Sequence, residues 1–224
     1  MKRFLHFYDW LIPRYARKPL VLVILFNFLC YYVPKALEGY RSDLHMISTR
    51  LDDALPRIPF FIIIYVLAYV QWVIAYIVII RDSRERCCRF VSGELTSKVI
   101  AMFILLAYPT TFHRPSIEVT GFSTWLTSLI YQSDTPTNLF PSMHCVASWF
   151  CFRGSLGLKK MPRWYAWVQG FFSLLVFASV LLVKQHVWPD IFGGIAVAEL
   201  GILLARLFHW ERYIEKLSSA RSHA

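Results

Sequence analysis

Charged residues are scarce in this sequence, because only 17% of its 224 residues are Asp, Glu, Lys or Arg, whereas 57% are hydrophobic. A soluble domain of this size needs more polar surface than such a composition provides. The scarcity of charge argues against a soluble all-helical protein with buried helices. It favours an integral membrane protein, in which lipid rather than water contacts most of the surface.

Several other features are absent as well. The five cysteines lack the pairing pattern of a disulfide framework, and the adjacent Cys87 and Cys88 lack a second ligand pair for a metal. The first residues carry no compact apolar core with a small-residue cleavage site, so we expect no cleaved signal peptide. Residues 1–18 instead mix charges and aromatics, which is typical of an amphipathic segment at the membrane interface. Because there is no internal repeat, we expect residues 1–224 to form one membrane-embedded domain.

Long runs with few or no charged residues recur along the chain. Residues 58–80 and 164–183 reach the length of about 20 residues that a helix needs to cross a bilayer. Four shorter runs continue the pattern, at residues 19–34, 99–112, 135–152 and 191–205. Together they predict an all-α, polytopic membrane protein with a bundle of six transmembrane helices. Two semi-polar segments, 43–54 and 119–133, are predicted as interfacial external helices.

The basic residues predict an orientation in the membrane. Eighteen of the 24 Lys and Arg residues lie in four segments, at 1–18, 81–98, 153–163 and 206–224. The other six lie in the alternate segments, at 35–57, 113–140 and 184–190. By the positive-inside rule, the first set of segments and both termini are cytoplasmic. Anionic lipid headgroups account for the net charge of +10, so we expect no nucleic-acid partner.

Three polar clusters map to the predicted external face. The stretch NLFPSMHCVASW, residues 138–149, carries His144 near the outer end of the fourth predicted helix. A lone histidine in an apolar run is usually a packed structural residue. However, YPTTFHRP at 108–115 and KQHVWPD at 184–190 are expected at the same face. The convergence of the three clusters predicts a functional site there.

The third cluster has a spacing that suits catalysis. His186 and Asp190 are four residues apart at a helix start marked by Pro189, so they share one helix face. An aspartate that accepts the proton of one imidazole nitrogen leaves the other nitrogen as a nucleophile or base. Arg114 and Lys184 add cations, and helix openings add backbone N–H groups that suit a phosphate. These groups suffice for phosphoryl transfer, and we expect no metal and no cofactor.

These motifs resemble a known family. Arg-Pro at 114–115, Pro-Ser-Met-His at 141–144 and His-Val-Trp-Pro-Asp at 186–190 resemble the three-part signature of the type 2 phosphatidic acid phosphatase superfamily. That superfamily also contains vanadium haloperoxidases and lipid phosphotransferases. Its usual pattern is Lys-x6-Arg-Pro, then Pro-Ser-Gly-His, then Ser-Arg-x5-His-x3-Asp. The resemblance covers about residues 108–194 and implies a catalytic core at about 98–208.

The resemblance implies a role for each motif residue. His186 would be the nucleophile that forms a phosphohistidine, and Asp190 would orient and activate it. His144 would protonate the leaving lipid alkoxide and then activate water for the second step. The residues expected to hold phosphate oxygens are Arg114, Lys184, Ser142 and Met143, and the other candidate pocket residues are Tyr108, Thr111 and His113.

The sequence departs from the family pattern at three positions. Ala107 stands where the first motif has lysine, Val180 where the third has arginine, and Met143 where the second has glycine. Two expected cations are therefore missing from their usual positions. Lys184, two residues before His186, is expected to supply one of them from a new position. These departures predict a divergent active member.

The sequence therefore predicts a lipid-phosphate phosphatase of the plasma membrane, with its site at the extracytoplasmic face. The expected substrates are phosphatidic acid-like, phosphatidylglycerol phosphate-like or polyprenyl (pyro)phosphate lipids. Two alternatives stay open. One is a lipid phosphotransferase of the same architecture, in which an alcohol replaces water. The other is a non-catalytic lipid-binding or transport protein, against which the intact His144, His186 and Asp190 argue.

Overall fold

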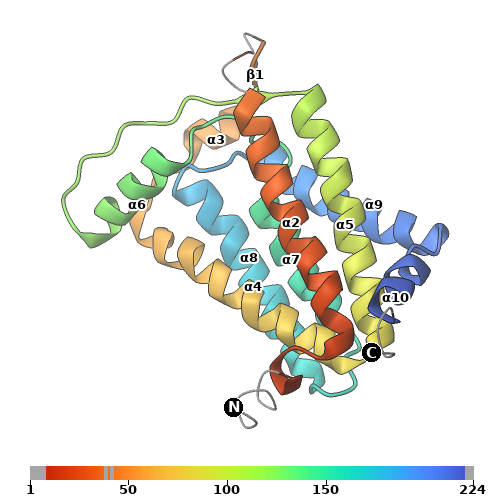
Figure 1. Cartoon of the computed structure of the whole chain (residues 1–224). Coiled ribbons are helices and arrows are strands. Elements are labelled where there is room, and N and C mark those ends of the chain that lie inside the picture. Colours follow the sequence, from red (N-terminus) through yellow and green to blue (C-terminus); the bar gives the residue numbers. More distant parts are fainter. Residues whose placement is uncertain (1–8, 38–39, 41–42, 220–224) are drawn as a thin grey trace.

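The computed structural model describes residues 9–37, 40 and 43–219, so the first eight residues of the predicted interfacial segment lie outside it. The described chain is mainly helical (Figure 1). Strands β1 (His45–Met46) and β2 (Thr110–Thr111) pair in parallel. The helices are α2 (Arg14–Leu37), α3 (Arg50–Ala54), the 3₁₀ helix η2 (Pro59–Phe61), α4 (Ile62–Asp82), α5 (Arg84–Ala107), α6 (Phe122–Ser133), α7 (Met143–Ser155), α8 (Arg163–Leu182), α9 (Trp188–Leu207) and α10 (Glu211–Ser219).

Four helical stretches are long and apolar enough to cross a membrane: α2, η2 with α4, α5 and α8. Helices α9 and α10 are bent by 73° at their junction and would add a fifth span if the pair were counted as one. Large apolar side chains are exposed on the flanks of these helices, among them Phe28, Val73, Phe103 and Phe171. Lipid contact explains why such side chains remain on the surface, which agrees with the expected all-α membrane protein.

The fourth predicted helix is shorter than expected. Helix α7 has only 13 residues, and the prediction of helix over 135–142 is wrong. The backbone N–H groups of Leu139 and Phe140 instead donate to the Thr110 hydroxyl, at 3.0 and 2.9 Å. Ser142 then caps α7 by accepting from the Cys145 N–H at 3.4 Å. The chain before α7 is therefore bound to β2 in a non-helical conformation.

Helix α5 is longer than expected. It begins at Arg84, where the Ser83 hydroxyl accepts from the Arg86 N–H at 3.1 Å, so most of the predicted cytoplasmic loop 81–98 is helix. Its charged residues Glu94 and Lys98 made this region resemble a loop in the sequence. Both are buried, and they form an ion pair of 3.1 Å one helical turn apart.

The Glu94–Lys98 pair is joined to two neighbouring helices. Lys98 Nζ donates to Asn27 Oδ1 of α2 at 2.5 Å, and the Tyr76 hydroxyl of α4 donates to Glu94 Oε1. A buried charge is tolerated when it is paired and hydrogen-bonded in this way. The positive-inside count must therefore exclude Lys98, which lies inside the bundle.

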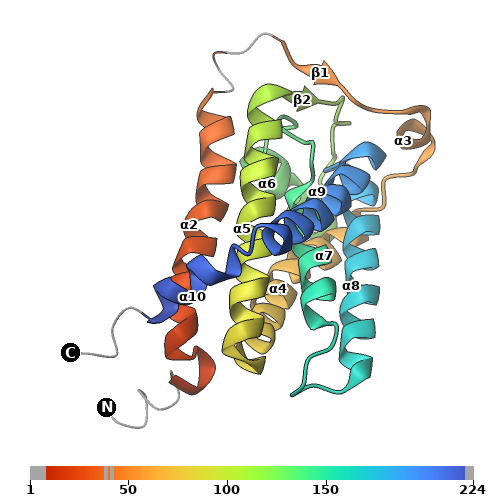
Figure 2. The ribbon, with the colours of Figure 1, turned by 90° about the vertical axis from the view of Figure 1, so that its right-hand side faces the viewer.

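The helix ends gather at two opposite ends of the bundle. In Figures 1 and 2, α3, β1 and β2 lie together at the upper end. The start of α2, the α4–α5 turn and the α7–α8 connection lie at the lower end, and α9 crosses the bundle obliquely against α5. Of the two predicted external helices, 119–133 contains α6, whereas 43–54 forms only β1 and the short α3.

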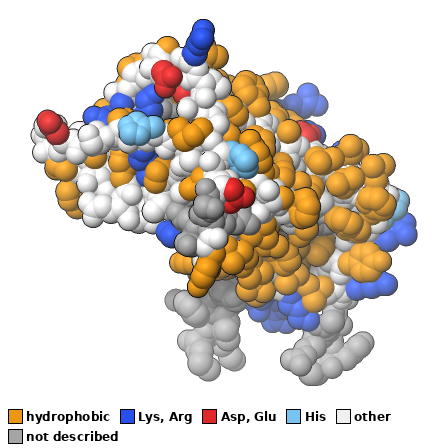
Figure 3. Space-filling view, turned by 90° about the horizontal axis from the view of Figure 1, so that it is seen from above, with side chains coloured by type: hydrophobic (Ala, Val, Ile, Leu, Met, Phe, Trp, Pro, Cys, Tyr) orange, Lys and Arg blue, Asp and Glu red, His pale blue; other side chains and the backbone are white. Residues whose placement is uncertain are grey.

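Seen from above, the upper end has two different surfaces. On the side of α6, Figure 3 shows histidine, Lys and Arg side chains among other polar groups. Toward α5 and α9, hydrophobic side chains cover most of the surface. The upper end therefore combines a polar surface with an apolar flank.

Candidate active site

His186 and Asp190 form the predicted pair at the opening of α9. His186 Nδ1 lies 2.9 Å from Asp190 Oδ2, and the same oxygen accepts from the Val187 N–H at 3.1 Å. The Asp190 side chain is fully buried, and that of His186 is 11% exposed. When the proton is on Nδ1, His186 donates to the aspartate and Nε2 keeps its lone pair. The pair therefore has the arrangement of an oriented nucleophile or base.

His144 lies next to His186, with 5.9 Å between the ring centroids. Its ring stacks on Tyr65 at a centroid distance of 4.4 Å, and its Nε2 lies 3.0 Å from the Tyr69 hydroxyl. Both tyrosines come from α4, so α4 fixes the His144 ring. Tyr69 is itself 46% exposed on the flank of the bundle. The second histidine is thus close to the surface that a lipid would contact.

Glycines allow the starts of α7 and α9 to approach closely. A Cβ atom on Gly194 would lie 2.9 Å from the Ser142 carbonyl oxygen, and one on Gly193 would lie 2.3 Å from the Phe140 ring. The Ser142 N–H also donates to the Asp190 carbonyl at 3.2 Å. Gly193 and Gly194 therefore allow the close packing that brings the two histidines together.

Hydrogen bonds with α6 and with the α3 region hold residues 183–188, the segment that carries His186. The Tyr131 hydroxyl of α6 donates to the Val183 carbonyl at 2.7 Å. Lys184 Nζ donates to the carbonyls of Asp52 and Leu55 at 2.7 and 2.8 Å. Lys184 also has a φ of 53°, a left-handed conformation that a lysine keeps only when its surroundings hold it.

Asp52 completes this attachment. Its Oδ1 accepts from the Trp188 N–H at 2.8 Å, and its Oδ2 accepts from the backbone and hydroxyl of Thr49, both at 2.7 Å. The N–H of Trp188 is one of the donors that a helix start leaves without an intrahelical partner. The α3 region therefore caps α9 next to His186.

Arg114 is held by protein groups close to His186. Its guanidinium donates to the Asp134 carbonyl at 2.6 Å and to Gln185 Oε1 at 2.8 Å, and it stacks over Tyr131 at 4.5 Å. Burial lowers the pKa of Arg114, whereas Tyr131 and Asp134 raise it. Arg114 therefore positions the residue before His186 through Gln185, and its described contacts are to protein groups.

A cavity of about 520 Å³ opens beside His186. Of the predicted site residues, it is lined by His113, Lys184 and His186. The α3 region adds charged residues that the sequence analysis did not select, namely Asp52, Asp53 and Arg57. No local pattern marks Asp52, because its hydrogen bonds to Lys184 and Trp188 join segments more than 120 residues apart along the chain. The only sequence signal is the run of charges in an otherwise apolar external segment.

The remaining predicted site residues lie outside the lining of this cavity. Tyr108 stacks on the His45 ring at 4.3 Å, and the Thr111 hydroxyl donates to the Pro136 carbonyl at 2.7 Å. Met143 packs against the apolar core, and Ser142 caps α7. Within the described part of the chain, no three His, Cys, Asp or Glu side chains are grouped to hold a metal ion.

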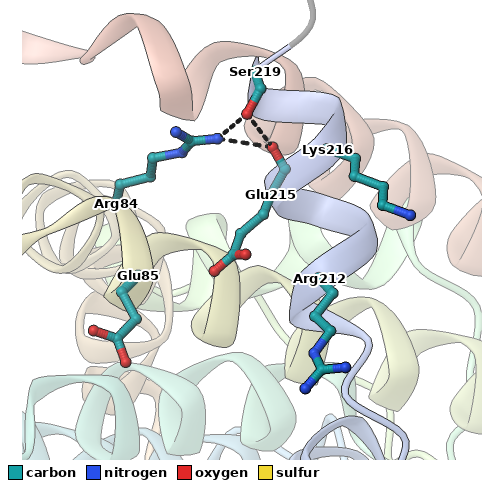
Figure 4. A pocket seen from close by; sticks show the side chains of 6 residues that line it. All are labelled: Arg84, Glu85, Arg212, Glu215, Lys216 and Ser219. Atoms are coloured by element: carbon teal, nitrogen blue, oxygen red, sulfur yellow. Dashed lines mark hydrogen bonds between the residues drawn. The ribbon is translucent and has the colours of Figure 1, made fainter.

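A second hollow, of about 940 Å³, lies at the start of α5 beside α10 (Figure 4). Arg84 donates there to the Glu215 carbonyl at 2.9 Å and to the Ser219 hydroxyl. The other lining residues are Glu85, Arg212 and Lys216. Among the described residues, no histidine lines this hollow, and none of its lining residues forms a buried pair comparable to His186–Asp190. The cavity at His186 is therefore the better candidate for chemistry.

No family model matches the chain, and no curated protein or solved structure matches it either. The three motifs and the geometry of His144, His186 and Asp190 are the features that indicate a function.

Proposed function

We propose that the protein is an integral membrane lipid-phosphate phosphatase of the type 2 phosphatidic acid phosphatase kind, which acts through a phosphohistidine. The observation that supports this most is the His186–Asp190 hydrogen bond of 2.9 Å beside a cavity lined with cations. An oriented imidazole, nearby positive charge and a second histidine are the groups that phosphoryl transfer requires. The motif resemblance supports the same reaction.

The first step transfers the phosphoryl group to the protein. The lone pair of His186 Nε2 attacks phosphorus, and the bond between phosphorus and the lipid oxygen breaks. The electron pair leaves with that oxygen, and His144 donates a proton to it. Asp190 stabilises the positive charge that develops on the His186 ring.

The second step regenerates the enzyme. His144, now without that proton, accepts one from a water molecule, whose oxygen attacks phosphorus. The bond between phosphorus and Nε2 breaks, and its electron pair returns to His186. Inorganic phosphate then leaves, and His144 is protonated again for the next turnover.

A lipid substrate agrees with the surroundings of the two histidines. His186 lines the polar cavity, whereas His144 contacts Tyr69, which is exposed on the flank of α4 beside the exposed Val70 and Val73. A phosphate in the cavity therefore directs its ester oxygen toward an apolar surface. A phosphomonoester or pyrophosphate on an acyl or prenyl lipid fits this division between polar and apolar surfaces.

The reaction is tested by phosphate release from a panel of lipid phosphates in detergent. We expect many turnovers with a single lipid substrate, unchanged rates in excess EDTA, and inhibition by vanadate, which mimics phosphate. Loss of activity in EDTA with rescue by magnesium would contradict this mechanism. If free phosphate stayed negligible and a new phosphodiester or phospholipid formed once an alcohol acceptor was added, the protein would be a phosphotransferase.

The membrane arrangement that we propose has six membrane-embedded helices, with α7 and α9 completing the four long ones. The lower end is cytoplasmic in this arrangement, since Arg86, Lys159 and Lys160 lie at its connections and α2 begins there. The upper end, with the active site, faces the extracytoplasmic side of the plasma membrane.

Cysteine labelling tests this orientation. In a background without the native cysteines, Ser133→Cys should react from outside intact cells with an impermeant maleimide, and Lys160→Cys should react only after the cells are opened. Both positions are exposed, so accessibility within the fold does not limit labelling. The reverse pattern would put the active site in the cytoplasm.

A further inference from the structure

We propose that Arg57 binds the substrate phosphate at His186 and replaces the cations that Ala107 and Val180 do not supply. This inference rests on the proposed function and names a binding residue of the same site. Arg57 lies in the connection between α3 and η2, outside the three motifs. It lines the cavity of about 520 Å³ together with His186.

Arg57 is fixed relative to His186 by hydrogen bonds on both sides of it in the chain. Before it, the Leu55 carbonyl accepts from Lys184 Nζ at 2.8 Å. After it, the Ile58 N–H donates to the Leu182 carbonyl at 2.8 Å. Both partners belong to the segment that leads to His186. The Arg57 backbone therefore has a defined place beside the nucleophile.

The guanidinium of Arg57 keeps donors for a ligand. It donates to the Ser116 carbonyl at 2.5 Å, which uses one of its five N–H groups. Burial raises the pKa of the Tyr131 hydroxyl, whereas Arg114 and a side-chain interaction with Arg57 lower it, so a second N–H group of Arg57 faces that hydroxyl. A partly anchored guanidinium with remaining donors suits bidentate binding of phosphate oxygens.

The other cations near His186 are less suited to this role. Arg114 donates to Asp134 and Gln185 and does not line the cavity. Lys184 Nζ donates to two carbonyls, which leaves one of its three protons. His113 is exposed and carries a full charge only when it is protonated. Arg57 is therefore the permanent positive charge in the cavity with the most donors left.

The acidic residues of the cavity make the positive charge of Arg57 more important for binding an anionic ligand. Both Asp52 oxygens accept hydrogen bonds, from Trp188 and Thr49. Asp53 is exposed and lines the same cavity, and its carboxylate repels an anionic ligand. Without the Arg57 guanidinium, a phosphate dianion would meet Asp53 with only Lys184 to balance it.

The test compares Arg57→Ala, Arg57→Gln and Arg57→Lys with Arg50→Ala, which removes an exposed arginine of α3 that does not line the cavity. Loss of a charged hydrogen-bonding partner should raise KM roughly 10- to 100-fold in Arg57→Ala and Arg57→Gln. Arg57→Gln keeps a donor for the Ser116 carbonyl. It therefore shows the effect of losing the positive charge while the anchoring hydrogen bond can still form. Arg57→Lys should recover part of the loss, and Arg50→Ala should match the wild type.

Vanadate binding, measured by calorimetry on the purified proteins in detergent, gives a second readout that needs no turnover. Weaker binding in Arg57→Ala and Arg57→Gln, but not in Arg50→Ala, supports the inference even if the wild type hydrolyses no lipid tested. In that case only the proposed function fails. Unchanged KM and vanadate affinity in an active, folded Arg57→Gln protein would overturn the role of Arg57 and leave the proposed function standing.

Discussion

Replacing His186 with alanine is expected to abolish lipid-phosphate hydrolysis, with a loss in kcat of about 10⁴-fold or more, because no other side chain takes its place as nucleophile. His186 lines the cavity, so removing its imidazole enlarges an existing space and the fold should survive. Activity is measured by phosphate release, and folding by thermal unfolding in detergent. His209→Ala, which removes an exposed histidine near the junction of α9 and α10, is the control and should retain wild-type activity.

The Asp190→Asn variant tests whether Asp190 orients the His186 ring, because it leaves the nucleophile itself in place. The amide fits the space of the carboxylate but carries no charge to stabilise the His186 ring, and its NH₂ group favours the wrong tautomer. We expect kcat to fall by about 10²- to 10⁴-fold while His186 remains present. Near-wild-type turnover of purified, folded His186→Ala or Asp190→Asn would exclude the phosphohistidine mechanism.

His144→Ala is expected to have an effect as large as that of Asp190→Asn, and its size should depend on the leaving group of the substrate. A lipid alkoxide needs a proton as it leaves, so turnover of lipid phosphates should fall by about 10²- to 10⁴-fold. Nitrophenolate leaves readily without a proton, so the first step with nitrophenyl phosphate should be nearly normal.

The second step still needs His144 to activate water. Rapid-mixing experiments with nitrophenyl phosphate should therefore show a burst of about one nitrophenol per site, followed by slow turnover. The trapped phosphoenzyme should carry its phosphate on His186. Equal losses for both substrates with no burst would remove His144 from acid–base catalysis and give it a structural role on Tyr65 and Tyr69.

The elements that could be predicted from the sequence are those whose signal is local. The spans at 58–80 and 164–183 correspond to α4 and α8, because long uncharged runs need no partner to be recognised. The contact between His186 and Asp190 follows from their spacing of four residues at a helix start. Helix α6 within 119–133 follows from its semi-polar pattern.

The elements that could not be predicted depend on distant partners. Glu94 and Lys98 resemble a loop in the sequence, because only the folded chain shows that they neutralise each other. The segment before α7 is uncharged but binds the Thr110 hydroxyl instead of forming helix. Arg114 carries a family motif, yet Gln185 and Asp134 engage it, and Arg57 reaches the cavity from outside every motif.

The buried pair in α5 also bears on how the chain enters the bilayer. A helix that carries Glu94 and Lys98 is expensive to transfer into lipid on its own. Asn27 and Tyr76, which bind the pair, belong to α2 and α4, and the ribosome makes both helices before α5. When α5 leaves the translocon, its polar partners are therefore already in the membrane. The order of synthesis thus matches the order in which these charges need partners.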